Sequence, residues 1–478
     1  MNFNKKLAVA VSGAVLLMAG QFALADSTTD IVDALVGKGV LTEEEGKLIS
    51  KGHESKKKAE GTVTFKDGFK INSGDGKSNM SIVGRIQLDA RSYDWKGNAA
   101  NDKTTDTFDI RRAYLGAKGT YQKYYDWEVV ADFASLTGTD ATTDTTAAGK
   151  TTTHLDVASF NLNYFNRKAM FQFGQFKMPY SLEERTSSRF IDFQERSFVN
   201  NTSLTSGKER GIMIHGTPVT GVNYAFAISS GQGKNVNDVD QRTEGVGYVG
   251  HIDTNIAEMY GDKESIYHLG ASYTSDSNMP VAALGKQRTE ARGYEFFSST
   301  AFTGNNMDRT RVGLEVALAK GPVKFQSEYS KVNFEGVSAL SASYDREVSA
   351  YYAEGLWLLT GEKYADSYKG GKFDRITPKN NFNPEDFSSL GAFEIGARYS
   401  KFDASDFTTT NAVGTGVIAA STMTNKAGSY VLGLKWIPSP NTRFLVNYVQ
   451  TDFDTDIVKN GETRDKEKAL IMRTQYDF

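Results

Sequence analysis

Through most of this chain, apolar and polar residues alternate one by one in segments of about ten residues. In residues 81–93, for example, Ile86 and Leu88 alternate with Gln87 and Asp89. Because successive side chains of a β-strand point to opposite faces, this pattern predicts strands with one apolar and one polar face. A soluble sandwich shows the same alternation, but segments of about 9–11 residues match tilted membrane-spanning strands. The pattern therefore predicts an all-β fold, a transmembrane antiparallel β-barrel.

We count sixteen such segments after residue 80, with fourteen or eighteen as alternatives. They are residues 81–93, 109–120, 125–134, 155–165, 169–177, 209–216, 221–230, 244–252, 265–274, 309–319, 322–333, 347–359, 390–400, 428–437, 442–453 and 467–478. The connections alternate between short turns and long loops, as in outer-membrane barrels whose termini lie on the short-turn side. Connections 253–264 and 360–389 are long where they should be short, which weakens the count.

The last predicted strand ends at the chain terminus, with Phe478 as its final residue. In a soluble domain such an uncovered strand edge invites aggregation, whereas in a closed barrel it pairs with the first strand. The terminal phenylalanine also resembles the signal that the barrel-assembly machinery reads. This machinery is therefore an expected partner during biogenesis, and outer-membrane lipid is the expected surrounding.

Residues 1–25 have the pattern of a cleaved signal peptide. Lys5 and Lys6 precede an apolar run over 7–18, and Ala23-Leu24-Ala25 forms a small-residue cleavage site. The apolar run is too short to span a bilayer, and no other window is long and apolar enough for a transmembrane helix. The mature chain is expected in the outer membrane of a Gram-negative bacterium.

Residues 26–60 have helical rather than strand spacing. Ile31, Ala34 and Leu35 recur at helical intervals, and the stretch from Thr42 to Glu45 resembles a helix start. We expect a helical periplasmic segment or oligomerisation element here, with a flexible spacer as the alternative. Residues 61–478 are expected to form the barrel domain.

Composition agrees with a barrel that has a wet interior. The chain of 478 residues is 39% hydrophobic, with 45 Gly, 29 Phe and 23 Tyr, and its mean hydropathy is −0.44. A barrel tolerates this polarity because only every second strand residue must be apolar. The chain has no cysteine, which excludes disulfides and cysteine-metal sites, and its net charge of −3 argues against nucleic acid as a partner.

Motifs for catalysis or cofactor binding are weak. The five histidines are scattered with no pair at metal spacing. Gly74 to Ser78 ends like a phosphate loop but lacks its first glycine, and the acidic run from Asp452 to Asp456 departs from a calcium loop. We therefore expect no cofactor, no metal site and no enzymatic activity. A Ser–His pair assembled from distant strands is the alternative.

Arginines in the first third of the barrel carry the clearest chemical signal. Strand parity places Arg85 and Arg112 on the inward face, whereas Arg111 would face lipid on a regular strand, so it needs a bulge, a strand end or a place in the loop. The long connection 178–208 contains Arg185, Arg189 and Arg196 among hydroxyl residues. Guanidinium groups in a narrow channel suit an oxyanion. The alternative is that these arginines only pair with nearby carboxylates: Glu183, Glu184, Asp192 and Glu195.

Five segments together carry a family resemblance: VGRIQLD (83–89), FDIRRAYLGAKGTYQKYYDWE (108–128), LDVASFNLNYF (155–165), FQFGQFKMPYSLEERTSSRFIDFQER (171–196) and LLTGEKYADSYKGGKFDRITPKNN (358–381). In their order and spacing they resemble the phosphate-selective porin O and P family. The likeness covers most of residues 61–478. It implies a sixteen-stranded trimeric porin with an anion-selective constriction and small anions such as phosphate as partners.

The resemblance also assigns roles to individual residues. It implies that the constriction is formed by matched arginines, serines and an aspartate: Arg85, Arg111, Arg112, Asp156, Ser187, Ser188 and Arg196. Lys286 and Arg288 match part of an outer basic ladder. Two family lysines are replaced by carboxylates, at Glu184 and at Glu128.

The predicted function is passive diffusion of small hydrophilic solutes, with a preference for anions and selectivity for phosphate. Because a carboxylate in a constriction opposes a bound dianion, Glu184 and Glu128 favour the alternative of a general or weakly selective pore. A closed barrel with a structural or adhesive role is the other alternative.

Overall fold

The computed structural model describes most of the chain, and the signal peptide predicted over 1–25 lies outside the described residues. These are residues 32, 35–59, 61–65, 68–94, 106–134, 154–201, 204–231, 233–235, 245–279, 286–299, 307–337, 343–409, 422–459 and 462–478.

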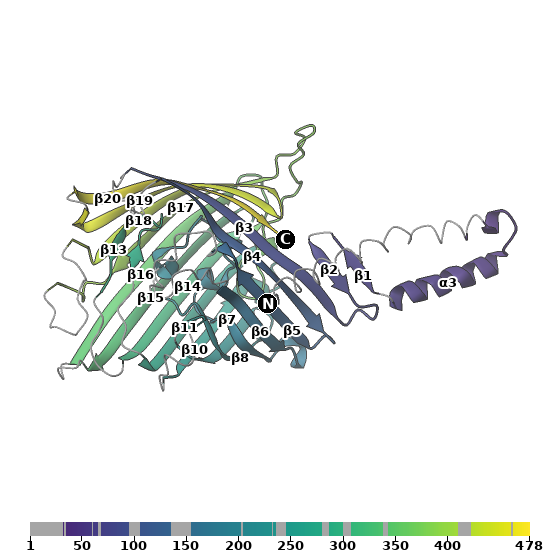
Figure 1. Ribbon diagram of the computed structural model, residues 1–478, viewed down its shortest axis with the longest axis horizontal. Coiled ribbons are helices and arrows are strands. Elements are labelled where there is room, and N and C mark those ends of the chain that lie inside the picture. The colour runs from purple at the N-terminus through teal and green to yellow at the C-terminus, as the bar shows by residue number, and fades with distance from the viewer. Residues whose placement is uncertain are drawn as a thin grey trace, which may run out of the picture. The chain divides into compact units, whose positions relative to one another are not determined.

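Within the described residues, sixteen long strands form one antiparallel sheet that closes on itself (Figure 1). The strands are β3 (Asn79–Tyr93), β4 (Thr107–Tyr121), β5 (Tyr125–Asp132), β6 (His154–Leu162), β7 (Met170–Lys177), β8 (Lys208–Val219), β9 (Val222–Ser229), β10 (Gly247–Asn255), β11 (Ser265–Met279), β14 (Met307–Lys320), β15 (Val323–Val337), β16 (Ser343–Leu358), β17 (Ala392–Asp403), β18 (Lys426–Ser439), β19 (Thr442–Lys459) and β20 (Glu462–Asp477). Each corresponds to one predicted segment, so the count of sixteen is confirmed.

The barrel closes where its last strand pairs with its first. The register of β20 on β3 runs from Ala469 opposite Tyr93 to Asp477 opposite Arg85. Beyond it, the backbone N–H of Gly84 donates to the carbonyl of Phe478 at 2.9 Å, and the N–H of Phe478 donates to the carbonyl of Gly84 at 3.1 Å. A side chain at Gly84 would collide with the Phe478 ring, so the glycine leaves room for the terminal aromatic residue.

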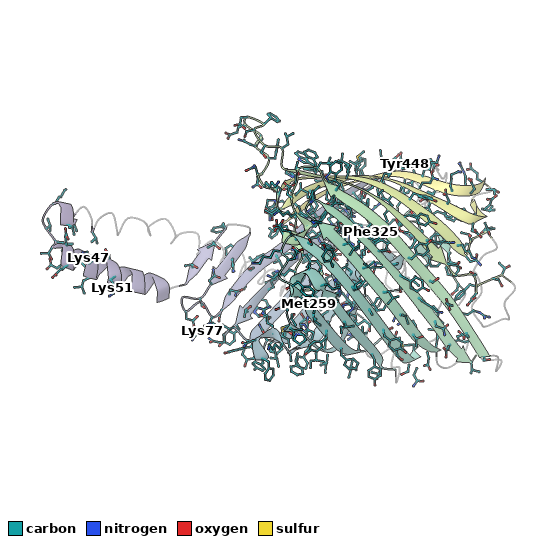
Figure 2. The ribbon with its side chains drawn as sticks, turned by 180° about the vertical axis from the view of Figure 1, so that it is seen from behind. Lys47, Lys51, Lys77, Met259, Phe325 and Tyr448 are labelled. Carbon is teal, nitrogen blue, oxygen red and sulfur yellow. The ribbon has the colours of Figure 1, made fainter. Side chains whose placement is uncertain are left out.

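Apolar side chains cover the outside of the barrel, and polar side chains fill its interior. On β14, Leu314 is 54% exposed, whereas Glu315 on the opposite face is 6% exposed. Phe325 of β15 and Tyr448 of β19 lie on the outer surface (Figure 2). This confirms that the apolar parity faces outward, the opposite of a soluble core, as a lipid environment requires.

The connections alternate in length as predicted, apart from one segment. Short turns join β4 to β5, β8 to β9, β14 to β15 and β18 to β19. The connection between β10 and β11 contains a short helix, α6 (Ile256–Met259). Residues 359–391 form a long connection on this same side, with the short 3₁₀ helix η5 (Tyr364–Ser367). Tyr364 and Phe373 in this segment are buried in a core cluster with wall residues such as Leu356.

The N-terminal unit consists of helix α3 (Glu43–Ala59) and the antiparallel pair β1 (Thr62–Thr64) and β2 (Phe69–Asn72). The predicted helix start is present, because the Thr42 hydroxyl accepts from the Glu45 N–H at 3.2 Å and Glu45 accepts from the Thr42 N–H at 2.9 Å. In the part of the chain that is described, no helix has the length and apolar character needed to cross a membrane.

Candidate functional site

A change of strand parity on β4 turns two consecutive arginines into the barrel. Phe108 and Ile110 are exposed before the change, and Leu115 is exposed after it. The even positions therefore face outward at first and the odd positions later, as a β-bulge produces. Arg111 and Arg112 both reach inward as a result, so of the alternatives that the sequence left open for Arg111, the change of parity favours a bulge.

The described part of the connection between β7 and β8, residues 178–201 and 204–207, folds into the barrel interior, and we call it the lumen loop. It contains two single-turn helices, α4 (Leu182–Arg185) and α5 (Phe198–Asn201). At the start of α4, the N–H groups of Leu182 and Glu183 donate to the Glu328 carboxylate of β15, at 3.0 and 2.6 Å. Further along the loop, Asp192 accepts from Lys324 of β15 at 2.6 Å. These bonds to wall residues hold the loop inside the barrel.

Glu195 is the most heavily bonded attachment of the lumen loop to the wall. Its carboxylate accepts from Arg91 at 3.1 Å, from Arg111 at 3.0 Å and from Arg473 at 3.1 Å. These arginines come from β3, β4 and β20, the strands around the closure of the barrel. Arg111 is therefore committed to an ion pair that holds the loop.

Arg196 braces the lumen loop from inside. Its Nη1 lies 3.3 Å from the Glu184 carboxylate, and its other nitrogens donate to the carbonyls of Glu183, Glu184 and Thr186. Lys177 lies 3.6 Å from the same Glu184 carboxylate. The carboxylate that replaces a family lysine is thus placed between two cations.

The lumen loop is expected to stay attached at mildly acidic pH. Burial disfavours the charged form of Glu195, but Arg111 and Arg473 outweigh it and hold the pKa of Glu195 well below its ordinary value of 4.5. At Glu184, burial likewise raises the pKa, but the neighbouring Arg196 and Lys177 lower it by more. The pKa of Glu184 is therefore also below its ordinary value. A carboxylate with a lowered folded-state pKa contributes stability above its ordinary pKa, and the contribution is lost as the pH falls through the lowered value.

We therefore expect single-channel conductance to keep its size and noise from pH 7 to about pH 5, and to become larger and noisier only below about pH 4. Recordings in planar bilayers across this range measure the effect. A larger, noisier conductance already at pH 6 would contradict the role of these carboxylates.

A cavity of about 980 Å³ lies beside the lumen loop, toward the short-turn end of the strands. Its lining includes nine lysines and arginines but five carboxylates, so its walls are positive overall. The basic residues are Arg85, Lys118, Arg167, Lys177, Arg185, Arg189, Lys208, Lys369 and Lys372, and the acidic ones are Glu128, Asp156, Asp253, Glu258 and Asp374.

Arg85 connects this cavity to the serine pair of the lumen loop. Its Nη1 donates to the Ser188 hydroxyl at 2.8 Å, and its guanidinium carbon lies 4.2 Å from the centre of the Tyr114 ring. The neighbouring Ser187 hydroxyl accepts from the N–H of Arg189 at 3.3 Å. These four polar residues, Arg85, Ser187, Ser188 and Arg189, all line the cavity and converge on one point of the loop.

Arg112 lies next to this group but does not line the cavity. Its Nη1 donates to the side chain of Gln87 at 2.9 Å, and Gln87 in turn donates to the carbonyl of Ser188 at 3.2 Å. Among the described residues, no carboxylate lies within 4.0 Å of the guanidinium nitrogens of Arg85, Arg112 or Arg189. We refer to these three as the unpaired arginines.

Asp156 faces the same cavity in the company of cations. Its carboxylate lies 2.5 Å from Lys208 and 3.6 Å from Lys234, and it accepts from the Tyr114 hydroxyl at 3.3 Å. Asp156 therefore offsets positive charge at the cavity wall and orients Tyr114, whose ring in turn contacts Arg85.

Sequence reasoning missed the basic residues on 359–391. Lys369 and Lys372 line the cavity from this segment, and Tyr368 bonds to His268 of the wall at 2.6 Å. The available signal was the length of this connection, which is unusual for the short-turn side.

The outer basic residues lie on a separate hairpin. Arg288 belongs to β12 (Gln287–Arg288), which pairs with β13 (Glu295–Phe297) in the connection between β11 and β14. Lys286 precedes it and lies 3.2 Å from Glu295, with most of its side chain exposed. Neither Lys286 nor Arg288 lines the cavity that contains Arg85, Ser187 and Ser188.

Chemically, the cavity and the lumen loop provide fixed positive charge and hydroxyl donors, and they suit binding or passage of a small oxyanion. Guanidinium forks can donate two parallel hydrogen bonds to such a group, and serine hydroxyls can add further ones.

Comparisons with known proteins agree with this architecture. The model of the family described as phosphate-selective porin O and P matches residues 80–478. Porin O of Pseudomonas aeruginosa is 24% identical over 439 residues, which covers 87% of this chain and 92% of that protein.

Two solved structures are also similar. An anion-selective porin from Comamonas acidovorans is 10% identical with a TM-score of 0.49, over 84% of this chain and all of that one. The outer-membrane channel DcaP of Acinetobacter baumannii is 12% identical with a TM-score of 0.49, over 84% of this chain and 98% of that one.

Proposed function

Since the chain belongs to the phosphate-selective porin O and P family and is an outer-membrane channel, we propose that it prefers anions and binds phosphate as it passes. The solute moves by passive diffusion, without a cofactor or an energy source. The constriction consists of the lumen loop and the wall residues that face it. Arg85, Ser187 and Ser188 contact the ion, Arg112 adds charge behind them, and Asp156 orients the group.

The unpaired arginines carry this proposal. A buried arginine ordinarily has a carboxylate partner, because an uncompensated buried charge is strongly destabilising. Arg85 is 4% exposed, and it has a serine hydroxyl and an aromatic ring as its neighbours instead. A passing anion supplies the missing countercharge, and each ion that enters relieves the repulsion among Arg85, Arg112 and Arg189.

The two carboxylates that depart from the family pattern are compensated. Glu184 lies between Arg196 and Lys177. Glu128 of β5 is the register partner of Lys118 on β4, and both line the cavity. The charge of Glu184 is therefore neutralised locally and Glu128 faces a lysine across the strand pair, which supports anion preference over the alternative of a weakly selective pore.

Other features of the proposed biology rest on the family. We propose a homotrimer in outer-membrane lipid, assembled by the barrel-assembly machinery that reads the strand ending in Phe478. Residues 26–60, which contain helix α3, are proposed to lie in the periplasm after cleavage of the signal peptide, as an oligomerisation element or a spacer.

The reversal potential in a KCl gradient tests the anion preference. Purified protein in planar bilayers should give a potential of the sign set by chloride, and phosphate at millimolar concentration should lower the chloride conductance. Cation preference would overturn the proposal, and a potential near zero would favour a general pore. If the channel preferred chloride but did not respond to phosphate, the proposed anion preference would stand and the proposed phosphate binding would be wrong. Absence of conductance in every reconstitution would favour a closed barrel.

A further inference from the structure

A cluster of two histidines and two carboxylates lies on the inner wall of the barrel. His251 and Asp253 are on β10, His268 is on β11, and Glu315 is on β14. All four side chains are buried, with exposures of 6% or less. The Nε2 atom of His251 lies 2.9 Å from an Asp253 oxygen and 3.7 Å from a Glu315 oxygen.

We propose that His251, Asp253 and Glu315 bind one divalent transition-metal ion of the zinc type, in competition with the guanidinium of Arg185. One nitrogen and two carboxylate oxygens are available, and these atoms all lie within 4.8 Å of one another. Ligand atoms around a tetrahedral zinc ion are roughly 3.5 Å apart, so shifts of about 1 Å would close the site. An imidazole ligand favours zinc, nickel or copper over calcium or magnesium.

The surroundings of the cluster orient its ligand atoms. The other ring nitrogen of His251, Nδ1, lies 2.9 Å from the Ser272 hydroxyl. The Ser272 hydroxyl can accept a hydrogen bond from Nδ1–H of His251. In that tautomer Nε2 carries no proton, and its lone pair is free to bind a metal ion. Asn223 donates to one Asp253 oxygen at 2.7 Å, which leaves the other oxygen facing the cluster. His268 lies 2.9 Å from the ligand oxygen of Glu315 and holds it from the far side.

Arg185 of the lumen loop marks the position of the cation. Its Nη1 donates to Asp253 at 3.0 Å and its Nη2 to Glu315 at 2.6 Å. With neutral histidines, the two carboxylates and one guanidinium leave a net charge of −1. A divalent ion in place of the guanidinium would neutralise both carboxylates and bring the net charge of the cluster from −1 to zero. Because an uncompensated buried charge is destabilising, this exchange lowers the electrostatic energy of the cluster.

Access to the cluster comes through the cavity. Arg185, His251 and Asp253 are among its lining residues. An ion that enters the cavity therefore meets the ligands without crossing the wall. Once displaced, the Arg185 side chain would remain in the cavity as an additional free cation, and zinc would increase the preference of the channel for anions.

Zinc binding to the purified protein, in detergent and without a histidine tag, tests the proposal. After treatment with a chelator, equilibrium dialysis with ZnCl₂ at pH 7.5 should give one ion per chain. Arg185→Ala and the bulkier Arg185→Gln should raise the affinity at least about tenfold, because the competing cation is gone. His251→Ala and Glu315→Gln should abolish stoichiometric binding.

His215→Ala is the matched control, because His215 lines the same cavity but bonds to Asn161 instead of to the cluster. It should bind zinc as the unchanged protein does, and CaCl₂ should not compete. Folding of each variant is checked by the shift of the barrel on heating in gel electrophoresis. No stoichiometric zinc in either the unchanged protein or the Arg185 variants would overturn the proposal. Retention of zinc by His251→Ala, or its loss in His215→Ala, would overturn it too. None of these outcomes depends on ion selectivity.

Discussion

Arg85→Glu is expected to lower the anion-to-cation permeability ratio by at least about tenfold. The Arg85 guanidinium is buried beside Ser188 and has no carboxylate partner within 4.0 Å among the described residues. At an effective dielectric constant of about 20, one unit charge acts on an ion about 8 Å away with about 2 kcal/mol. Inverting the charge changes this energy by about twice that amount, and partial screening still leaves more than the 1.4 kcal/mol that corresponds to tenfold. The reversal potential in a KCl gradient measures the change.

Arg464→Glu provides the control for charge inversion. Arg464 is exposed near the outer end of β20 and lies 3.2 Å from Glu462. Salt screens such a charge within about 8–10 Å, so this change should leave the permeability ratio nearly constant. Arg85→Gln should have about half the effect of Arg85→Glu. Equal, negligible shifts in all three variants would remove Arg85 from the anion path.

Glu195→Ala is expected to release the lumen loop and to destabilise the barrel. The change would leave Arg91, Arg111 and Arg473 around a buried site without their shared carboxylate. Removing one partner from a buried ionic cluster typically costs about 3–5 kcal/mol. We expect a larger, noisier single-channel conductance and a lower midpoint in thermal unfolding.

Glu264→Ala is a matched control, because Glu264 pairs with Lys363 at 2.6 Å on the surface. An exposed pair of this kind contributes about 0–1 kcal/mol, so both measurements should stay close to those of the unchanged protein. If Glu195→Ala behaved like Glu264→Ala, the loop would be held by its other contacts alone.

The barrel was predictable from the sequence because lipid and water impose a strict period of two on each strand. The alternation of Ile86 and Leu88 with Gln87 and Asp89 is enough to orient β3, and the exposures agree. Strand length was less predictable. The segment expected over 442–453 extends to Lys459, since β19 continues beyond the apolar band where the alternation no longer has to separate lipid from water.

The candidate site was predictable only in part. Parity placed Arg112 inside the barrel but left the position of Arg111 open, and the structure has both side chains inside. Their hydrogen-bond partners could not be predicted. Arg111 bonds to Glu195 of the lumen loop and Arg112 to Gln87 of β3, and both partners are distant in the sequence. Arg185 is bonded to Asp253 and Glu315, partners 68 and 130 residues away, and no local pattern encodes such a contact.

The lumen loop forms hydrogen bonds and an ion pair with both strands of the seam, β20 and β3, on the inner side of the barrel. Arg473 and Gln475 of β20 bond to Glu195 and to the carbonyl of Arg189, while Arg85 of β3 bonds to Ser188 of the same loop. Peeling the final strand away would break these bonds together with the backbone hydrogen bonds of the seam. Opening of the seam and displacement of the lumen loop would therefore be one event, and neither could happen while the other stayed intact.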